Sequence, residues 1–281
     1  MMFSLLLSAA LAFTPEDASL AFETAKGLVE ECTPRGAGTI RGNIAANWLL
    51  DKASATGADV RRDVFAASTP KGERRFVNLY AEFKGDPTNR WVVLLSHYDT
   101  KRGCPGANDG ASTSGLLVSL ANVIVNAKEP VGNVMLVWTD GEECMGETYS
   151  EGDGFQGAKR AVEYLQQKER KVQAVICLDM LGDKDLAISV PANGSATLSK
   201  IACHAARRIG EPNLVSLSDV TVKDDHCAFI SAGYPAIDLI DFDYGPSNGW
   251  WHTPEDTCDK ISADSLLKAG RLVCEMLGIL L

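Results

Sequence analysis

The chain has 281 residues, of which 46% are hydrophobic, and its formal net charge is -10 at pH 7. This length and composition allow one domain with a full hydrophobic core. The negative charge argues against nucleic acid or an anionic membrane surface as a partner. No stretch reaches the roughly 18 apolar residues needed to cross a bilayer, so we expect no membrane span.

The N-terminus contains a short apolar run that closes with an Ala-x-Ala sequence at Ala12. This pattern is typical of a secretory signal peptide, although it is short and has no Lys or Arg at its start. We therefore interpret residues 1–12 as a candidate signal peptide and expect export to the periplasm or the exterior. The alternative is a docked N-terminal helical segment of a cytoplasmic protein. Residues 13–281 are expected to form a single domain.

Helices and strands are expected to alternate along this domain, judged from helical spacing of apolar residues and from short β-branched or aliphatic runs. The expected helices cover 16–31, 43–55, 113–125, 155–170, 196–209 and 262–281. The expected strands cover 59–66, 75–83, 91–95, 134–138, 172–178, 186–190, 214–217 and 234–240. The first two strands are joined by turn-forming residues and should pair antiparallel. The order predicts a three-layer α/β/α sandwich with a mixed, mainly parallel central sheet.

Acidic and imidazole side chains follow three of the predicted buried strands, at the point where each strand ends. In open α/β sheets, ligands bind in the crevice outside the carboxyl ends of the strands, so these side chains should converge. Asp109 is expected at or just ahead of a helix N-terminus, and a late loop supplies His252. His97 and Asp99 follow the strand at 91–95. Asp140, Glu142 and Glu143 follow the strand at 134–138, and Asp179 follows the strand at 172–178.

Such a cluster favours a metal site. Buried carboxylates repel one another and need a cation nearby. A set of His, Asp and Glu side chains suits zinc, with room left for a substrate. The eight cysteines include no Cys-x-x-Cys pair, which disfavours a cysteine zinc site. For any single position, the alternative is a polar residue that simply begins a loop.

The motifs jointly resemble peptidase family M28, which includes zinc aminopeptidases and their relatives, the animal-type glutaminyl-peptide cyclotransferases. The resemblance spans roughly residues 30–280, and it implies a single zinc-dependent catalytic domain that acts on the N-termini of peptides or proteins. The motifs are His97-x-Asp99, Gly106-Ala-Asn-Asp109-Gly, Asp140-Gly-Glu142-Glu143, Leu178-Asp179-Met, Asp225-His226 and His252-Thr253.

The resemblance also implies a role for each matching residue, with one or two Zn²⁺ ions as the cofactor. Asp109 can bridge two metal ions in the pattern of the family. His97 and Asp179 would complete one metal site, and Glu143 and His252 would complete the other. Glu142 matches the general acid and base of the family. Asp99 would orient His97 from behind.

Local departures favour a cyclotransferase over an aminopeptidase. The loop over residues 144–156 is long, and its Ser150-x-x-Asp153-x-x-x-Gly157 pattern is similar to that of cyclotransferases. The sequence Asp224-Asp225-His226 resembles the cyclotransferase version of a motif that more often reads Ser-Asp-His in aminopeptidases. The stretch Thr69-Pro-x-Gly-x-x-x-Phe76-x-Asn78 and Trp251 point the same way. An M28 aminopeptidase is the alternative, since both kinds of enzyme carry the five metal-ligating residues.

Five residues carry further expectations under the cyclotransferase interpretation. Asp224, hydrogen-bonded near Asp179, would help Glu142 to relay a proton, and Asp179 would therefore also take part in catalysis. Trp251 would form an apolar wall for the substrate glutamine; otherwise it is a core aromatic. Asp225 and His226 would support the site from behind, or His226 simply begins a helix. A metal-free receptor or scaffold of the same fold is a third class, but it would have no reason to retain Glu142 and the whole ligand set.

Overall fold

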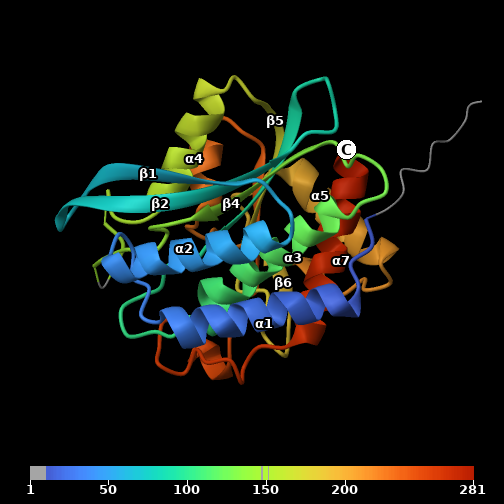
Figure 1. The fold of residues 1–281 in the computed structure, drawn as a ribbon. Coiled ribbons are helices and arrows are strands. Elements are labelled where there is room, and N and C mark those ends of the chain that lie inside the picture. The colour runs from blue at the N-terminus through green and yellow to red at the C-terminus, as the bar shows by residue number, and fades with distance from the viewer. Residues whose placement is uncertain (1–10, 147, 151) are drawn as a thin grey trace, which may run out of the picture.

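A computed structural model describes residues 11–146, 148–150 and 152–281 (Figure 1). The elements expected from the sequence occur in the expected order, with boundaries shifted by a few residues. The helices are α1 (Pro15–Cys32), α2 (Ile40–Ala55), α3 (Thr113–Val125), α4 (Gln156–Gln167), α5 (Ala196–Arg208), α6 (His226–Ser231) and α7 (Ala263–Leu280). The strands are β1 (Val60–Thr69), β2 (Gly72–Phe83), β3 (Arg90–His97), β4 (Asn133–Thr139), β5 (Lys171–Asp179), β6 (Ile188–Val190), β7 (Val215–Leu217) and β8 (Ala236–Ile240).

The candidate signal peptide at residues 1–12 lies almost entirely outside the described residues, which begin at Leu11. Within the described part of the chain, no helix is both long and apolar enough to cross a membrane. Two short helical segments complete the element order, η1 (Ala107–Ser112) just ahead of α3 and η2 (Pro246–Asn248) in the loop after β8. The sequence offered a helix that begins at His226 only as an alternative, because the six residues of α6 are too few to show a helical period.

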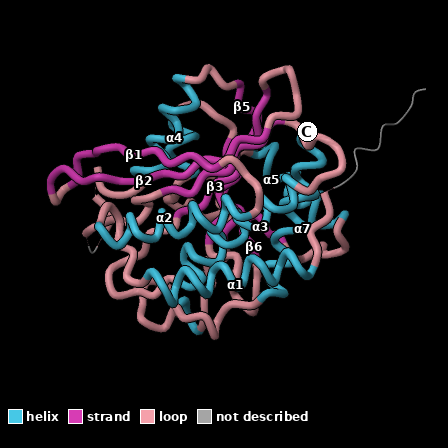
Figure 2. Tube along the Cα trace, viewed as in Figure 1, coloured by secondary structure: helices cyan, strands magenta, loops and turns pink. Residues whose placement is uncertain are grey.

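An eight-stranded sheet runs through the centre of the molecule in the order β1-β2-β4-β3-β5-β8-β6-β7 (Figure 2). The adjacent strands β4, β3, β5 and β8 are parallel, whereas β1 and β2 form an antiparallel hairpin at one edge and β6 runs antiparallel to β8. The expected antiparallel pair and the mixed, mainly parallel sheet are therefore confirmed. Figure 1 shows α1, α2, α3 and α7 on one side of the sheet and α4 on the other.

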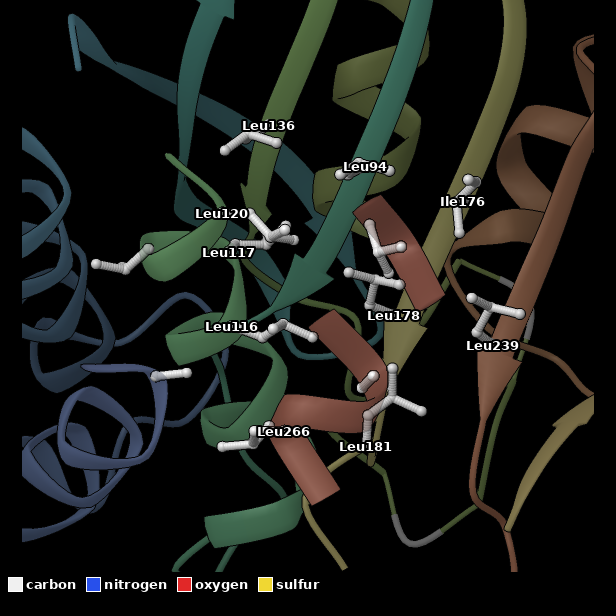
Figure 3. Close-up of a cluster of buried hydrophobic side chains, with 14 of the residues drawn as sticks. Leu94, Leu116, Leu117, Leu120, Leu136, Ile176, Leu178, Leu181, Leu239 and Leu266 are labelled. Carbon is white, nitrogen blue, oxygen red and sulfur yellow. The ribbon is translucent and has the colours of Figure 1, made fainter. Parts of the chain in front are cut away.

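Alternation of side chains along the central strands builds a core on each face of the sheet, because successive residues of a strand point to opposite faces. In β3, Val92 and Leu94 join the core beneath α1, α3 and α7, while Trp91, Val93 and Leu95 join the core beneath α4 and α6. Figure 3 shows leucines of the larger core meeting between the sheet and helices α3 and α7. Each fully buried leucine there contributes about 1.5–3 kcal/mol. The two cores confirm the three-layer sandwich.

Local sequence signals account for the starts of two helices and for the edge hairpin. Thr14 and Asp17 form a reciprocal capping box at the start of α1. The side chain of Thr39 accepts a hydrogen bond from the backbone of Gly42, so α2 starts earlier than its apolar period suggests. In the hairpin, Thr69 pairs with Gly72, which leaves a two-residue loop and places Lys71 at its tip.

Candidate metal and substrate site

The carboxyl ends of three adjacent strands meet at one edge of the sheet. Strand β3 ends at His97, β4 ends at Thr139 just before Asp140-Gly-Glu-Glu143, and β5 ends at Asp179. Because β3 lies between β4 and β5 and runs parallel to both, their terminal side chains emerge side by side. The strand ends predict a site at this edge, and the structure brings His97, Glu143 and Asp179 together there. Asp140 is an exception, because its carboxylate instead accepts the backbone N–H groups of Gly38 and Val77.

The first group of potential metal ligands consists of His97, Asp109 and Asp179. The Nε2 atom of His97 lies 3.1 Å from Oδ1 of Asp109 and 3.2 Å from Oδ1 of Asp179. One donor atom from each residue falls within 4.8 Å of the others. Gly110 permits this approach, because a Cβ atom there would lie 2.5 Å from the carbonyl oxygen of His97 and 2.7 Å from its ring. A larger residue would therefore push Asp109 away from His97.

The second group consists of Asp109, Glu143 and His252. The Nε2 atom of His252 lies 3.3 Å from Oδ2 of Asp109 and 3.2 Å from Oε1 of Glu143. The donor atoms again lie within 4.8 Å of one another. Asp109 thus offers one oxygen to each group. This is the arrangement that the resemblance implies for two cations with a shared aspartate, and the binding of metal by these five side chains stays a prediction.

Electrostatics at the two groups favour a cation. Burial raises the pKa of Asp179 to about 7, and burial together with the Asp109 carboxylate raises the pKa of Glu143. Burial alone would lower the pKa of each imidazole, but contacts with the carboxylates outweigh it. They raise the pKa of His252 to about 10 and that of His97 well above its usual value. A buried site that draws positive charge onto both imidazoles fits a divalent metal with N and O ligands.

Asp99 holds the segment that carries both glutamates. Its Oδ1 accepts the backbone N–H groups of Gly141 at 2.9 Å and Glu142 at 3.2 Å, and its Oδ2 accepts that of Glu143 at 3.1 Å. The Nδ1 atom of His97 lies 3.7 Å from the Asp99 carboxylate but 3.1 Å from the Asp99 backbone carbonyl. The contacts of the carboxylate are therefore mainly with this backbone segment, a function that sequence analysis did not identify.

Asp256 holds the segment around Asp109 in the same way, by accepting its backbone N–H groups. The sequence did not indicate this role. Its carboxylate accepts the backbone N–H groups of Asn108 at 2.8 Å and Asp109 at 3.2 Å, and the hydroxyl of Tyr244 at 2.7 Å. The only signal in the sequence is that Asp256 follows the candidate ligand His252 by four residues in the same loop. That spacing does not indicate a contact with a segment 147 residues earlier.

Arg35 is a second support that was not predicted. Its guanidinium is buried and donates to the backbone carbonyls of Tyr98 at 2.6 Å and Pro105 at 2.6 Å, and also to that of Gly106. These bonds tie the end of β3 to the segment that leads to Asp109. A single arginine in a Pro-Arg-Gly stretch does not by itself indicate a buried guanidinium that binds backbone carbonyls.

Glu142 lies outside both ligand groups and lines the adjoining pocket. Burial, followed by repulsion from Asp224, raises the pKa of its carboxyl group well above the usual range. A carboxyl group with a raised pKa beside a pocket is suited to proton transfer near neutral pH. Asp224 lines the same pocket and accepts from the thiol of Cys177 at 3.4 Å and from the backbone N–H of Asp225. Its hydrogen bonds within the described residues are these, rather than one to Asp179.

Asp225 and His226 lie behind Asp224 and touch neither ligand group. The Oδ2 atom of Asp225 accepts the hydroxyl of Thr139 at 2.6 Å, which fastens the start of α6 to the end of β4. Burial raises the pKa of Asp225 to about 8. His226 is the first residue of α6; its Nε2 lies 3.0 Å from the side-chain nitrogen of Asn193, and its Nδ1 lies 3.9 Å from Asp238.

The pocket beside the ligand groups has a volume of about 430 Å³. Trp251 lines it and stacks on the ring of His252, with centroids 3.9 Å apart, and it makes a T-shaped contact with Phe242, with centroids 4.9 Å apart. Tyr149 and Phe155 also line the pocket. Neither of these residues nor Phe242 is one of the named positions of a motif, so the sequence did not single them out. The full lining is Lys101, Asp109, Glu142, Glu143, Cys144, Thr148, Tyr149, Phe155, Asp179, Val222, Lys223, Asp224, Ile240, Phe242, Trp251 and His252.

Comparison with known proteins places this site in a family context. The family model for peptidase family M28 matches residues 78–277, which include every residue of the two ligand groups. Among solved structures, a glutaminyl cyclase from an Acidobacteriales bacterium is similar over 100% of this chain and 99% of its own, with a TM-score of 0.88 and 30% sequence identity.

Two relatives represent the two activities that the motifs left open. Aminopeptidase YwaD of Bacillus subtilis is 31% identical over 193 residues, which is 65% of this chain and 39% of that protein. The glutaminyl-peptide cyclotransferase-like protein of Mus musculus is 25% identical over 273 residues, which is 84% of this chain and 70% of that protein. The chain therefore spans well under half the length of the aminopeptidase that it matches.

Proposed function

Because the chain belongs to peptidase family M28 and is an enzyme of that type, we propose that it is a glutaminyl-peptide cyclotransferase. This enzyme converts the N-terminal glutamine of a peptide or protein to pyroglutamate with release of ammonia. The observation that carries the proposal is the placement of Glu142 in an aromatic-lined pocket directly beside the two ligand groups. The similarity of the whole chain to a bacterial glutaminyl cyclase supports it.

The proposed cofactor is one or two Zn²⁺ ions. His97, Asp109 and Asp179 would hold one ion, and Asp109, Glu143 and His252 would hold the other. An ion held by these residues would supply Lewis acidity towards the side-chain carbonyl of the glutamine. Asp99 and Asp256 fix the backbone of the segments that carry Asp109 and Glu143, so the ligands are held in place before a metal binds.

Glu142 would carry the proton in the proposed reaction. The α-amine of the substrate attacks the side-chain carbonyl carbon, and the carboxylate of Glu142 takes a proton from that amine. The same proton then goes to the departing amide nitrogen, which leaves as ammonia, so Glu142 returns to its starting form. Asp224 lies close enough to raise the pKa of Glu142 and would help to retain the proton between these two steps.

The aromatic walls would hold the glutamine side chain and limit access of water. Trp251, Phe242 and Tyr149 present apolar surface to the pocket. Cyclisation consumes no water, and a water-poor pocket reduces competing hydrolysis. Trp251 is stacked on His252, so one residue would both support a metal ligand and shape the pocket.

An M28 aminopeptidase is the second candidate function. The observation that favours it is the pair of ligand groups sharing Asp109, which suits two metal ions and an activated water. In that case Glu142 would deprotonate the water for attack on the first peptide bond. The similarity to the Bacillus subtilis aminopeptidase supports this alternative over the matched region alone.

Mass spectrometry of two peptides separates the candidates. The peptides are identical except for an N-terminal Gln or Leu, and each is incubated with zinc-loaded enzyme. We expect the Gln peptide to lose the mass of one ammonia molecule and the Leu peptide to stay intact. Free leucine without pyroglutamate would instead establish the aminopeptidase. The Glu142→Gln variant, purified in parallel, controls for contaminating activity.

Export is a separate proposal. Residues 1–12 would be removed as a signal peptide, which leaves a mature protein that begins close to Phe13. N-terminal sequencing of the protein recovered from the exported fraction tests this. An intact Met1 in the mature protein would contradict it.

A further inference from the structure

A second groove, with a volume of about 440 Å³, adjoins the substrate pocket and is rich in positive charge. It lies between the start of α2, the tip of the β1–β2 hairpin and the loops that follow β3 and β4. Five cationic side chains line it in a protein whose net charge is -10. They are Arg41, Lys71, Arg74, Lys101 and Arg102.

These cations lack acidic partners among the described residues. None of the five has a carboxylate within 4.0 Å in the described part of the chain. Arg41 donates to the backbone carbonyl of Thr33 at 2.8 Å, Arg74 donates to that of Glu73 at 2.9 Å, and Lys71 donates to that of Met145. Carbonyl oxygens orient the side chains without neutralising their charge, so the groove presents a positive field to the solvent.

The groove is continuous with the substrate pocket. Lys101, Glu143 and Cys144 line both of them. The backbone N–H of Lys101 donates to Oε1 of Glu143 at 3.0 Å, and its ammonium group donates to the carbonyl of Cys144 at 3.0 Å. A substrate peptide that extends from the pocket beside the ligand groups would therefore enter the groove at Lys101.

We propose that this groove binds acidic side chains of the residues that follow the N-terminal residue of the substrate. The inference rests on the proposed function, since it assigns the substrate's first residue to the pocket and its next residues to the groove. Peptides with Asp or Glu after the first residue are then the preferred substrate class, because their charge complements cations that have no carboxylate partner among the described residues. Exposed pairs of this kind weaken as salt rises.

The test compares three Gln-initiated peptides of equal length whose following residues are acidic, neutral or basic. Pyroglutamate formation is measured at low ionic strength and in about 1 M NaCl, where the Debye length is about 3 Å. We expect kcat/KM to be at least roughly threefold higher for the acidic than for the neutral peptide at low salt, as a few exposed ion pairs would give. The basic peptide should be the poorest substrate, and high salt should remove the differences.

Two double variants locate the effect. Lys71→Gln/Arg102→Gln removes two cations of the groove, and Lys84→Gln/Lys128→Gln removes two exposed cations that do not line it. Both change the net charge equally. The ratio of kcat/KM for the acidic peptide to that for the neutral peptide should fall towards one in the groove variant and stay at the wild-type value in the other.

Each contrary result has a distinct meaning. Equal rates for the three Gln peptides would overturn the inference about the groove and leave the proposed function standing. An acidic preference that persists in the groove variant would also overturn it, because the preference would then arise elsewhere. Absence of pyroglutamate from all three peptides, with zinc bound, would overturn the proposed function itself.

Discussion

The substrate pocket has two unlike sides. The metal side, named for the proposed zinc ions, is formed by the two ligand groups, and the aromatic side is formed by Tyr149, Phe155, Phe242 and Trp251. On the metal side, Asp109 and Glu143 are 3% and 4% exposed, whereas Tyr149 and Phe242 on the aromatic side are 43% and 38% exposed. One side is therefore built into the core of the protein, and the other is built largely from loops on its surface.

This difference indicates where each property of the enzyme resides. Four residues of the metal side stand on strand ends or on segments tied down by Asp99 and Asp256, which fixes their positions, whereas His252 stands on the loop after β8 and is 25% exposed. A cyclotransferase and an aminopeptidase can both use such a side. The aromatic side decides what fits beside the metal, so selectivity for glutamine should depend on it. Changes on the metal side should abolish all activity, and changes on the aromatic side should alter substrate preference.

The largest effect is expected from removal of a ligand on the metal side. Asp109→Ala or His252→Ala removes one donor, and Asp109 serves both groups. We expect metal affinity to fall by more than about 100-fold, since changes to outer partners of a ligand already cost about 10- to 100-fold. Zinc per protein after dialysis is the measurement, with the exposed Asp243→Ala as control. Full zinc content in both ligand variants would refute the site.

Glu142→Gln separates chemistry from metal binding on the same side. An amide cannot shuttle a proton, so kcat should fall by about 10²- to 10⁴-fold. Zinc content and melting temperature should match those of the wild type, because Glu142 belongs to neither ligand group. Turnover close to the wild-type rate would remove Glu142 from the mechanism.

Asp99→Asn probes the rigidity of the metal side. The amide replaces one oxygen of a buried carboxylate that accepts three backbone N–H groups, which places donor against donor. We expect the free energy of unfolding to drop by about 1–3 kcal/mol and the Glu142–Glu143 segment to loosen. Urea denaturation monitored by circular dichroism measures the first effect. An unchanged denaturation midpoint would mean that these bonds contribute little.

Trp251→Ala tests the aromatic side and should leave the metal side intact. Loss of an apolar wall should cost about 1–3 kcal/mol in kcat/KM for a Gln peptide, with zinc still bound. The matched control is Trp48→Ala, a half-buried tryptophan on α2 that does not line the pocket. If cyclisation is untouched in Trp251→Ala, the tryptophan is a packing residue only.

Local sequence information located the elements and one half of the site. The apolar runs that became β3, β4 and β5 were recognisable because buried parallel strands are continuously hydrophobic. Each run stops at a ligand-type residue, so His97, Glu143 and Asp179 could be assigned to one edge of the sheet. The predicted start of a helix was less accurate where a capping residue determines it, as Thr39 does for α2. The period of apolar residues marks only the buried face of a helix and does not mark its first turn.

Only the tertiary structure decided which residues support and surround that site. The buried Asp256 accepts hydrogen bonds from a segment 147 residues away, and Arg35 donates to carbonyls 63 and 70 residues further along the chain. Phe242, Tyr149 and Trp251 meet because separate loops converge, and the cations of the groove gather in the same way. Short-range patterns determine strands and their ends, whereas contacts between loops depend on where the packed layers bring them.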